Sequence, residues 1–277
     1  MRLLVTDGVH ELGRWVEVTG LGKGVDATGR LGDGALERTI AVLGRFGEVM
    51  DRESVERRAA IATSATRDAA NRDQFLERAA SALGVMPEVI RGDREGELAY
   101  AGATAGLDEG PHVVADIGGG STEFVTAGAT VSIDIGSVRL TDRVLTDRPA
   151  SREQVELATA HVTDLFSGID AAGELVGVAG TWTSLAGIDL GLATYDREKT
   201  HRHRLSREAV DELVDDLAGM TLGETEQIPS LDPARAPVIL AGAVIAGRVL
   251  AAVDADTALV SERDSLDGLA AELLGLT

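Results

Sequence analysis

The chain has 277 residues, of which 44% are apolar and 26% charged, a composition that suits one large or two medium folded domains. It contains no Cys, which excludes disulfides, thiolate metal sites and cysteine nucleophiles. Its net charge of −20 opposes the approach of nucleic acid, so we expect no nucleic-acid partner. No signal-type segment precedes the first predicted strand, and the longest apolar stretch is interrupted by Arg248. We therefore expect a cytoplasmic protein that does not span a membrane.

The first part of the chain predicts strands that alternate with amphipathic helices. Apolar residues recur at helical spacing in the first predicted helix, with Leu36, Ile40 and Leu43 on one face. The predicted strands span residues 2–6, 14–19, 58–63 and 88–91, and the predicted helices span residues 36–50, 72–83 and 94–105. Alternation of this kind predicts an α/β fold.

A similar order begins again after a break at residues 106–111. The predicted strands span residues 112–117, 123–127, 130–135, 175–179 and 258–260. The predicted helices span residues 152–165, 206–219 and 236–253, and a short helix ends the chain. Ser206 has a side chain suited to cap the second of these helices.

One segment carries most of the chemical information: Asp116-Ile-Gly-Gly-Gly-Ser-Thr-Glu123. A buried strand delivers Asp116 to its carboxyl end, and glycines allow backbone N–H groups to approach an anion closely. The predicted phosphate-binding residues of this turn are Gly118, Gly119, Gly120, Ser121 and Thr122. Asp116 and Glu123 are the predicted Mg²⁺ site, since carboxylates hold the metal while amides hold phosphate oxygens. The alternative is a glycine-rich hairpin turn with a structural Asp.

Two strand-to-helix junctions resemble each other, at residues 60–66 and 177–183. Each is an apolar strand that ends in small and hydroxyl residues. We interpret this as an internal duplication that gives two facing domains, residues 1–110 and 111–277, with the last helix able to pack back on the first. Gly180 and Thr181 are candidates for a second anion pocket, and a helix cap is the alternative.

The duplication is incomplete in the first domain. The second half reads strand, glycine turn, strand, strand, whereas residues 1–5 correspond to the strand that begins at Glu123. A first strand with its own phosphate loop, about ten residues, is expected ahead of Met1. Either the start codon is assigned too late, which we favour, or the chain is truncated and weakly active. Without that strand we expect unpaired backbone groups, an open apolar slot and low stability of residues 1–110.

Several segments together resemble the exopolyphosphatase/guanosine pentaphosphatase (Ppx/GppA) family of the actin–Hsp70–sugar-kinase superfamily. They occur in the same order and cover nearly the whole chain: Arg2-Leu-Leu-Val5, Ala62-Thr-Ser-Ala-Thr-Arg-Asp68, Gly92-Asp-Arg-Glu-Gly-Glu-Leu-Ala-Tyr100, the glycine motif, Gly136-Ser-Val-Arg-Leu140, Gly177-Val-Ala-Gly-Thr181 and Glu262-Arg-Asp-Ser-Leu-Asp-Gly268. The resemblance implies two ribonuclease-H-like domains that face each other around a central cleft.

The resemblance also implies Mg²⁺-dependent release of terminal orthophosphate from inorganic polyphosphate. It assigns the residue that acts on the attacking water to Glu95, or to Glu97 if the alignment slips, because family members usually have paired acids there. It assigns a phosphate contact to Arg67. From the residues alone, the alternatives are a Glu95 that stabilises a helix start and an Arg67 that pairs with Asp68 or Asp73.

Two other functions stay open at this point. One is hydrolysis of the 5′-phosphate of guanosine pentaphosphate, although the sequence has no identifiable guanine pocket. The other is a catalytically weak polyphosphate or nucleotide sensor, because the first phosphate loop is not in the chain. The apolar segment Val238–Leu250 could pair two copies as a homodimer or form a buried helix within one chain.

Overall fold

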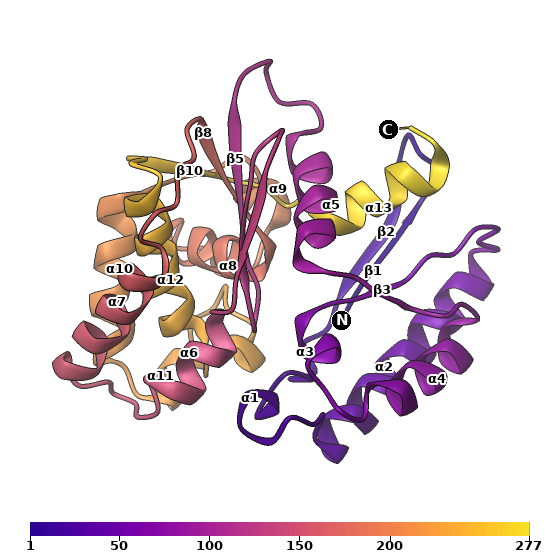
Figure 1. Ribbon diagram of the computed structural model, residues 1–277, viewed down its shortest axis with the longest axis horizontal. Coiled ribbons are helices and arrows are strands. Elements are labelled where there is room, and N and C mark those ends of the chain that lie inside the picture. Colours follow the sequence, from indigo (N-terminus) through magenta and orange to yellow (C-terminus); the bar gives the residue numbers. More distant parts are fainter. Residues whose placement is uncertain (277) are drawn as a thin grey trace.

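The computed structural model describes residues 1–276 and has the α/β architecture that the sequence predicts. The strands are β1 (Arg2–Thr6), β2 (Glu11–Val16), β3 (Ile61–Ala62), β4 (Glu88–Val89), β5 (His112–Ile117), β6 (Thr122–Val125), β7 (Thr130–Ile133), β8 (Glu174–Val178), β9 (Arg204–Ser206) and β10 (Thr257–Val260). The helices are α1 (Val25–Thr28), α2 (Asp33–Arg52), α3 (Ser64–Arg67), α4 (Arg72–Leu83), α5 (Gly92–Thr104), α6 (Ser137–Arg143), α7 (Arg152–Leu165), α8 (Ala179–Asp189), α9 (Arg197–Thr200), α10 (Arg207–Gly219), α11 (Leu222–Thr225), α12 (Ile239–Ala252) and α13 (Ser265–Leu274), with a 3₁₀ turn at Pro233–Arg235. Figure 1 shows them arranged in two lobes. Within residues 1–276, no helix combines the length and the apolar character needed to cross a membrane.

The larger lobe is built on a six-stranded sheet in the order β7-β6-β5-β8-β10-β9. Strands β5, β8 and β10 are parallel, and β6, β7 and β9 run antiparallel to the strands they pair with. Side chains alternate along β5, so Val113, Ala115 and Ile117 enter the main core with α7 and α12, whereas Val114 joins a second cluster with α5. Asp116 therefore lies on the α5 side of the sheet.

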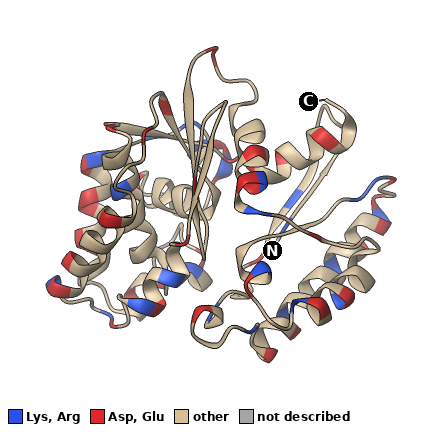
Figure 2. Ribbon diagram, in the orientation of Figure 1, with Lys and Arg blue, Asp and Glu red and all other residues tan. Residues whose placement is uncertain are grey.

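Helix α12 lies inside this lobe rather than on its surface. It is apolar on all sides, and most of its side chains from Ile239 to Leu250 are buried in the main core. Charged residues are found instead along the outer helices, as Figure 2 shows. Of the two alternatives for this segment, the buried intrachain helix is therefore the one that the structure contains.

The smaller lobe contains two separate two-stranded sheets, β1-β2 antiparallel and β3-β4 parallel. Helices α2 and α4 form its core through Leu43, Phe46 and Phe75. Strand β3 is only Ile61–Ala62, shorter than the predicted 58–63, because it has a partner on one side only. The predicted strand 14–19 is displaced toward the N-terminus, where β2 ends at Val16.

In the described residues, the smaller lobe has no counterpart of the central strand β5. In the larger lobe β5 lies between β6 and β8; in the smaller lobe β1 corresponds to β6 and β3 to β8, but residues 1–276 contain no strand between them. A cavity of about 510 Å³ occupies this place, with Leu4, Phe46 and Ile61 among its walls, and it continues into the cleft between the lobes. The apolar slot expected from the sequence is therefore present.

The last helix returns to the smaller lobe. Helix α13 packs against α5 and β1, as Figure 1 shows. Its crossing with α5 is close, because a Cβ at Gly102 would lie 2.0 Å from the carbonyl oxygen of Asp264, and a Cβ at Gly268 would lie 2.0 Å from that of Leu98. We propose to keep the division at residues 110 and 111, with α13 counted in the first domain.

Candidate active site

Helix α5 presses Glu95 against the large sheet. The start of α5 approaches β6 and β7 closely because two positions lack side chains: a Cβ at Gly92 would lie 2.4 Å from Ser132 Oγ, and a Cβ at Gly96 would lie 2.6 Å from a methyl group of Val125. Glu95 lies between these glycines in the first turn of the helix and is only 8% exposed. The sheet and the helix together remove its carboxylate from bulk water.

Strands β5 and β6 add two carboxylates on the same face. Asp116 and Glu123 stand directly opposite each other in the antiparallel register, so both side chains are turned toward α5. Both are buried, at 3% and 1% exposure. Oε1 of Glu123 accepts a hydrogen bond from Ser132 Oγ at 2.7 Å, which fixes its orientation. Three carboxylates from two lobes therefore gather where α5 meets the sheet.

These carboxyl groups oppose one another's ionisation. Burial raises the pKa of Glu95 to about 8, with further contributions from the charges of Glu123 and Asp116. Burial and the charge of Asp116 raise the pKa of Glu123 to about 7. Burial raises the pKa of Asp116 to about 6, against the opposing effect of Arg2. Oε2 of Glu95 is buried and has no hydrogen-bond partner within residues 1–276. A cation at this place would relieve all of these costs.

This donor set fits a hard divalent cation held partly by the protein. Mg²⁺ binds one or two carboxylates and completes its shell with water and phosphate oxygens. In the described part of the chain, no three His, Cys, Asp or Glu side chains converge closely enough to enclose a metal by themselves. Asp116 and Glu123, with the unpaired Oε2 of Glu95 in their vicinity, therefore suit a metal that is shared with substrate and water.

The glycine turn presents free amides to the cleft. Its carbonyl groups are already used, because those of Gly118 and Gly119 accept the first N–H groups of α6, and the Gly118 N–H donates to Ser121 at 3.0 Å. Across residues 1–276, the N–H groups of Gly119 and Gly120 have no acceptor. Ser64 of the smaller lobe comes so close that a Cβ on Gly120 would lie 2.5 Å from its Oγ. Two amides and one hydroxyl are thus available to an anion.

The motif also contains two hydroxyl side chains, Ser121 and Thr122. Thr122 Oγ1 donates to the carbonyl oxygen of Ile135 at 2.6 Å. The Ser121 side chain lowers the pKa of the Glu123 carboxyl group. Neither hydroxyl residue lines the cavity. Phosphate binding by Ser121 and Thr122 stays a prediction, and the Thr122 hydroxyl proton already has a protein acceptor.

The β8–α8 junction forms the facing wall. Ala179 has a φ of 68°, a left-handed conformation that is uncommon for a residue with a Cβ. No side chain caps α8, so its first amides, at Gly180 and Thr181, lack an intrahelical partner. The Thr181 hydroxyl donates to the carbonyl oxygen of Ile117 at 3.3 Å. Only the backbone of this junction is therefore free to bind an anion.

One cavity gathers most of the predicted site. The cavity has a volume of about 510 Å³, and the residues that line it include Glu95, Asp116, Gly118, Gly119, Gly120, Gly180 and Thr181. Arg67 and Glu123 are outside this lining. Arg67 donates to the carbonyl oxygen of Ile90 at 3.2 Å and lies 3.7 Å from Asp68, the ion pair that the sequence allowed. Its charge still lowers the pKa of Glu95, so it remains close to the carboxylates.

The cavity lining also includes polar residues that were not among the predicted site residues, such as Arg2, Ser64 and Arg235. Ser64 belongs to the duplicated junction, which could have pointed to it. Arg2 belongs to a segment that carries the family resemblance, and its side chain pairs with Asp264. Arg235 belongs to no motif, because it stands alone in a Pro- and Ala-rich stretch ahead of α12. Only the fold brings it to the cleft.

Two lobes around a cleft, free backbone amides on both walls and buried carboxylates suited to a divalent cation define a phosphate-transferring α/β enzyme. Residues 5–276 match the Ppx/GppA phosphatase family, and the chain belongs to this family. It is therefore a hydrolase that acts on phosphoric anhydrides. Phosphatases of this family generally depend on a divalent metal.

Similar proteins support the same assignment. Exopolyphosphatase 2 of Mycobacterium tuberculosis is 36% identical over 304 residues, which cover 99% of this chain and 95% of the relative. The crystal structure of an exopolyphosphatase-like protein superposes with a TM-score of 0.92 at 36% identity, covering 97% of this chain and 93% of that one. A Ppx/GppA protein of Aquifex aeolicus gives a TM-score of 0.82 at 32% identity, with 99% and 94% covered. The predicted fold of two facing actin-like domains is therefore confirmed.

Proposed function

We propose that this chain releases terminal orthophosphate from inorganic polyphosphate with Mg²⁺, and that Glu95 orients the attacking water. One observation carries the proposal: the buried carboxylate of Glu95 has an unpaired oxygen and shares a cavity with free glycine amides and Asp116. The printed names of the relatives, exopolyphosphatases, support polyphosphate as the substrate.

The residues divide the work of phosphoryl transfer, which needs positioning and charge neutralisation more than covalent chemistry. The amides of Gly119 and Gly120 bind oxygens of the terminal phosphate, and the first amides of α8 bind the anion from the other lobe. Asp116 and Glu123 would hold Mg²⁺, which would neutralise phosphate charge when bound. Glu95 accepts a proton from the water that it orients.

The environment of Glu95 suits a base that works near neutral pH. Without a cation its pKa is about 8, and a nearby positive charge lowers that value, so the carboxylate becomes ionised when the site is loaded. A carboxylate at its ordinary pKa would be a weaker proton acceptor.

The test is orthophosphate release by the purified chain from tripolyphosphate and from guanosine pentaphosphate, each with Mg²⁺ and with EDTA. We expect Mg²⁺-dependent release that is faster on tripolyphosphate. Faster release from guanosine pentaphosphate would select nucleotide hydrolysis. Mg²⁺-dependent binding of either anion without release would select the sensor.

A further inference from the structure

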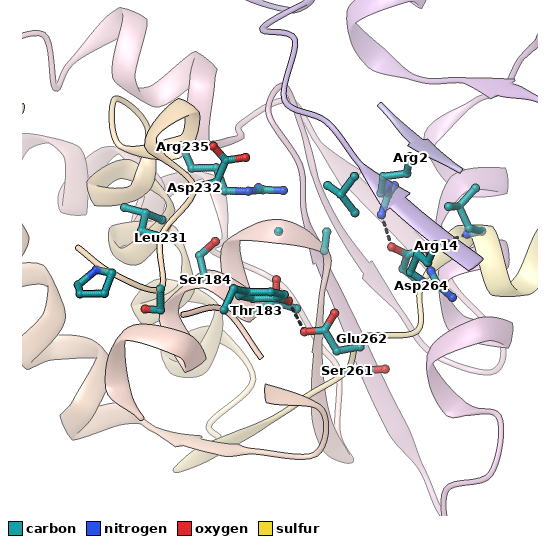
Figure 3. Close-up of a pocket in the computed structure, with 17 residues that line it drawn as sticks. Arg2, Arg14, Thr183, Ser184, Leu231, Asp232, Arg235, Ser261, Glu262 and Asp264 are labelled. Atoms are coloured by element: carbon teal, nitrogen blue, oxygen red, sulfur yellow. Dashed lines mark hydrogen bonds and ion pairs between the residues drawn. The ribbon is translucent and has the colours of Figure 1, made fainter. Parts of the chain in front are cut away.

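Two kinds of arginine–carboxylate pair occur at the cleft. A second cavity of about 340 Å³ adjoins the first, and in its wall Arg2 pairs with Asp264, as Figure 3 shows. Arg14, in the same wall, pairs with Asp267 at 2.6 Å. These pairs join the β1-β2 hairpin to α13 and its N-cap, so both partners belong to the smaller lobe. Arg139 of α6 differs, because its hydrogen-bonded carboxylate belongs to the opposite lobe.

Arg139 is fixed beside the glycine turn. Its backbone N–H donates to the carbonyl oxygen of Gly119 at 3.1 Å. Its guanidinium is close to the next residue of the turn, because a Cβ at Gly120 would lie 3.7 Å from Nη2. All three residues line the first cavity, and the N–H groups of the two glycines have no acceptor within residues 1–276. An anion that binds these amides therefore comes within reach of the guanidinium.

The guanidinium of Arg139 is only weakly engaged by the protein. Within residues 1–276 it makes one hydrogen bond, from Nη2 to Asp68 at 3.1 Å. Nη1 lies 3.6 Å from Asp26 and 3.9 Å from Asp134, which are ion-pair distances without a hydrogen bond. Asp26 is held instead by two hydrogen bonds from Arg143, at 2.6 and 2.7 Å, and these are the main cause of its lowered pKa. Arg139 therefore keeps N–H donors for another acceptor.

Asp68 neutralises two arginines that come from different lobes. It accepts the hydrogen bond from Arg139 at the start of α6, and it lies 3.7 Å from Nε of Arg67 at the end of α3. The Asp68 side chain is 36% exposed, and the residue lines the first cavity. An ion pair with this exposure is weak. A phosphate, which has more charge and more oxygens than a carboxylate, can therefore take the place of Asp68.

We propose that Arg139 is a substrate-binding residue that contacts the terminal phosphate bound at Gly119 and Gly120, and that Asp68 holds this arginine until substrate arrives. The inference rests on the proposed function. A phosphate on the two amides offers its other oxygens to the guanidinium, which matches two of them at once. The substrate must displace Asp68, so its apparent affinity is lowered by the fraction of the protein in which the ion pair is formed.

The experiment measures how each partner of this ion pair affects binding. Calorimetry gives the affinity for tripolyphosphate with Mg²⁺ in a Glu95→Gln background, where turnover does not interfere. Arg139→Met removes the cation, and Asp68→Asn removes its competitor with little change in side-chain size. Two matched controls change the net charge equally at exposed side chains: Arg152→Met, at 92% exposure, and Asp73→Asn, at 89%. Thermal melting checks that each variant is folded.

The two changes should act in opposite directions. Arg139→Met should weaken tripolyphosphate binding by about tenfold, as for the loss of a hydrogen bond to a charged group, and Arg139→Lys should recover part of the loss. Asp68→Asn should strengthen binding by about threefold, and this gain should shrink in a chain that also carries Arg139→Met. Both controls should change binding by less than about twofold, because exposed charges are screened. In steady-state release with Glu95 present, Arg139→Met should raise KM more than it lowers kcat.

An Arg139 that only ties the lobes together predicts the reverse for Asp68→Asn, since loss of either partner would then weaken binding. Weaker or unchanged binding by folded Asp68→Asn, unchanged binding by folded Arg139→Met, or an equal gain from Asp73→Asn would overturn the proposal. Absence of tripolyphosphate binding in the Glu95→Gln parent would overturn it as well. If the wild-type chain binds tripolyphosphate but releases no orthophosphate, the proposed function fails, while the binding measurements still decide the role of Arg139.

Discussion

Replacing Glu95 by Gln should stabilise the metal-free protein at neutral pH. The pKa of Glu95 rises from its ordinary 4.5 to about 8 in the folded chain. Between these values the folded state binds a proton that the unfolded state releases. The free energy of unfolding therefore falls as the pH rises from about 5 to 8. Gln does not titrate, so in the Glu95→Gln variant the free energy of unfolding no longer falls with pH for this reason.

The magnitude follows from the gap between the two states. At pH 7, which is about 2.5 units above its ordinary pKa, the carboxyl group is ionised in the unfolded chain but still protonated in the folded one. Keeping this proton lowers the free energy of unfolding by about 3 kcal/mol relative to low pH. A Gln amide without a full set of partners costs about 1 kcal/mol in return. The net gain is about 2 kcal/mol at pH 7, or about 4–8 °C in melting temperature for a chain of this size.

Thermal melts in EDTA at pH 5, 7 and 8 measure this effect. The Glu95→Gln variant should melt above the wild type at pH 7 and 8 and close to it at pH 5. Glu97→Gln serves as the control, since Glu97 is exposed and paired with Arg94 at 3.3 Å. A Glu95→Gln variant that melts below the wild type at pH 8, or a difference that does not change with pH, would refute a buried Glu95 carboxyl group with a raised pKa.

Two further predictions concern the framework of the site. Gly102→Ala should lower the free energy of unfolding by about 1–3 kcal/mol and detach α13 from α5, because the new Cβ would lie 2.0 Å from the Asp264 carbonyl oxygen. Gly44→Ala is the control: a Cβ there has nothing within 4 Å, so the change should stabilise α2 by about 0.5–1 kcal/mol. Denaturant titrations in which Gly102→Ala is the more stable variant would contradict the close crossing. An apolar extended segment joined through a turn ahead of Met1 should pair with β1 and β3, fill the slot between them and raise the melting temperature of the smaller lobe, so equal melting with and without it would show that the slot does not accept a strand.

Local sequence patterns determined several helices in both lobes. Helices α4 and α7 begin and end at the predicted residues, and Ser206 caps α10 by accepting the N–H of Ala209 at 3.1 Å. These elements follow from periodicity and capping, which act over a few residues. Strand β3 was predicted too long because strand length depends on partners, and its sheet offers one only.

The site shows the same division between local and long-range effects. Asp116 and the glycines were readable because one short segment holds them. The hydrogen bond from the Thr122 hydroxyl to the carbonyl oxygen of Ile135 could not be predicted, because only the fold brings these two residues together. Arg235 was not predicted, because only the tertiary structure brings it to the cleft. The hydrogen-bond partners and the burial of a polar side chain depend on residues far away in the sequence, so a single segment cannot predict them.

We propose that Glu95, and not Glu97, acts on the attacking water. Steady-state release of orthophosphate from tripolyphosphate with Mg²⁺ tests it on Glu95→Gln and Glu97→Gln side by side. Both changes remove one carboxylate from α5, one buried at the sheet and one exposed. We expect a loss of at least about 100-fold in kcat for Glu95→Gln and less than about twofold for Glu97→Gln. Equal turnover of Glu95→Gln and the wild type, with both folded, would contradict the account.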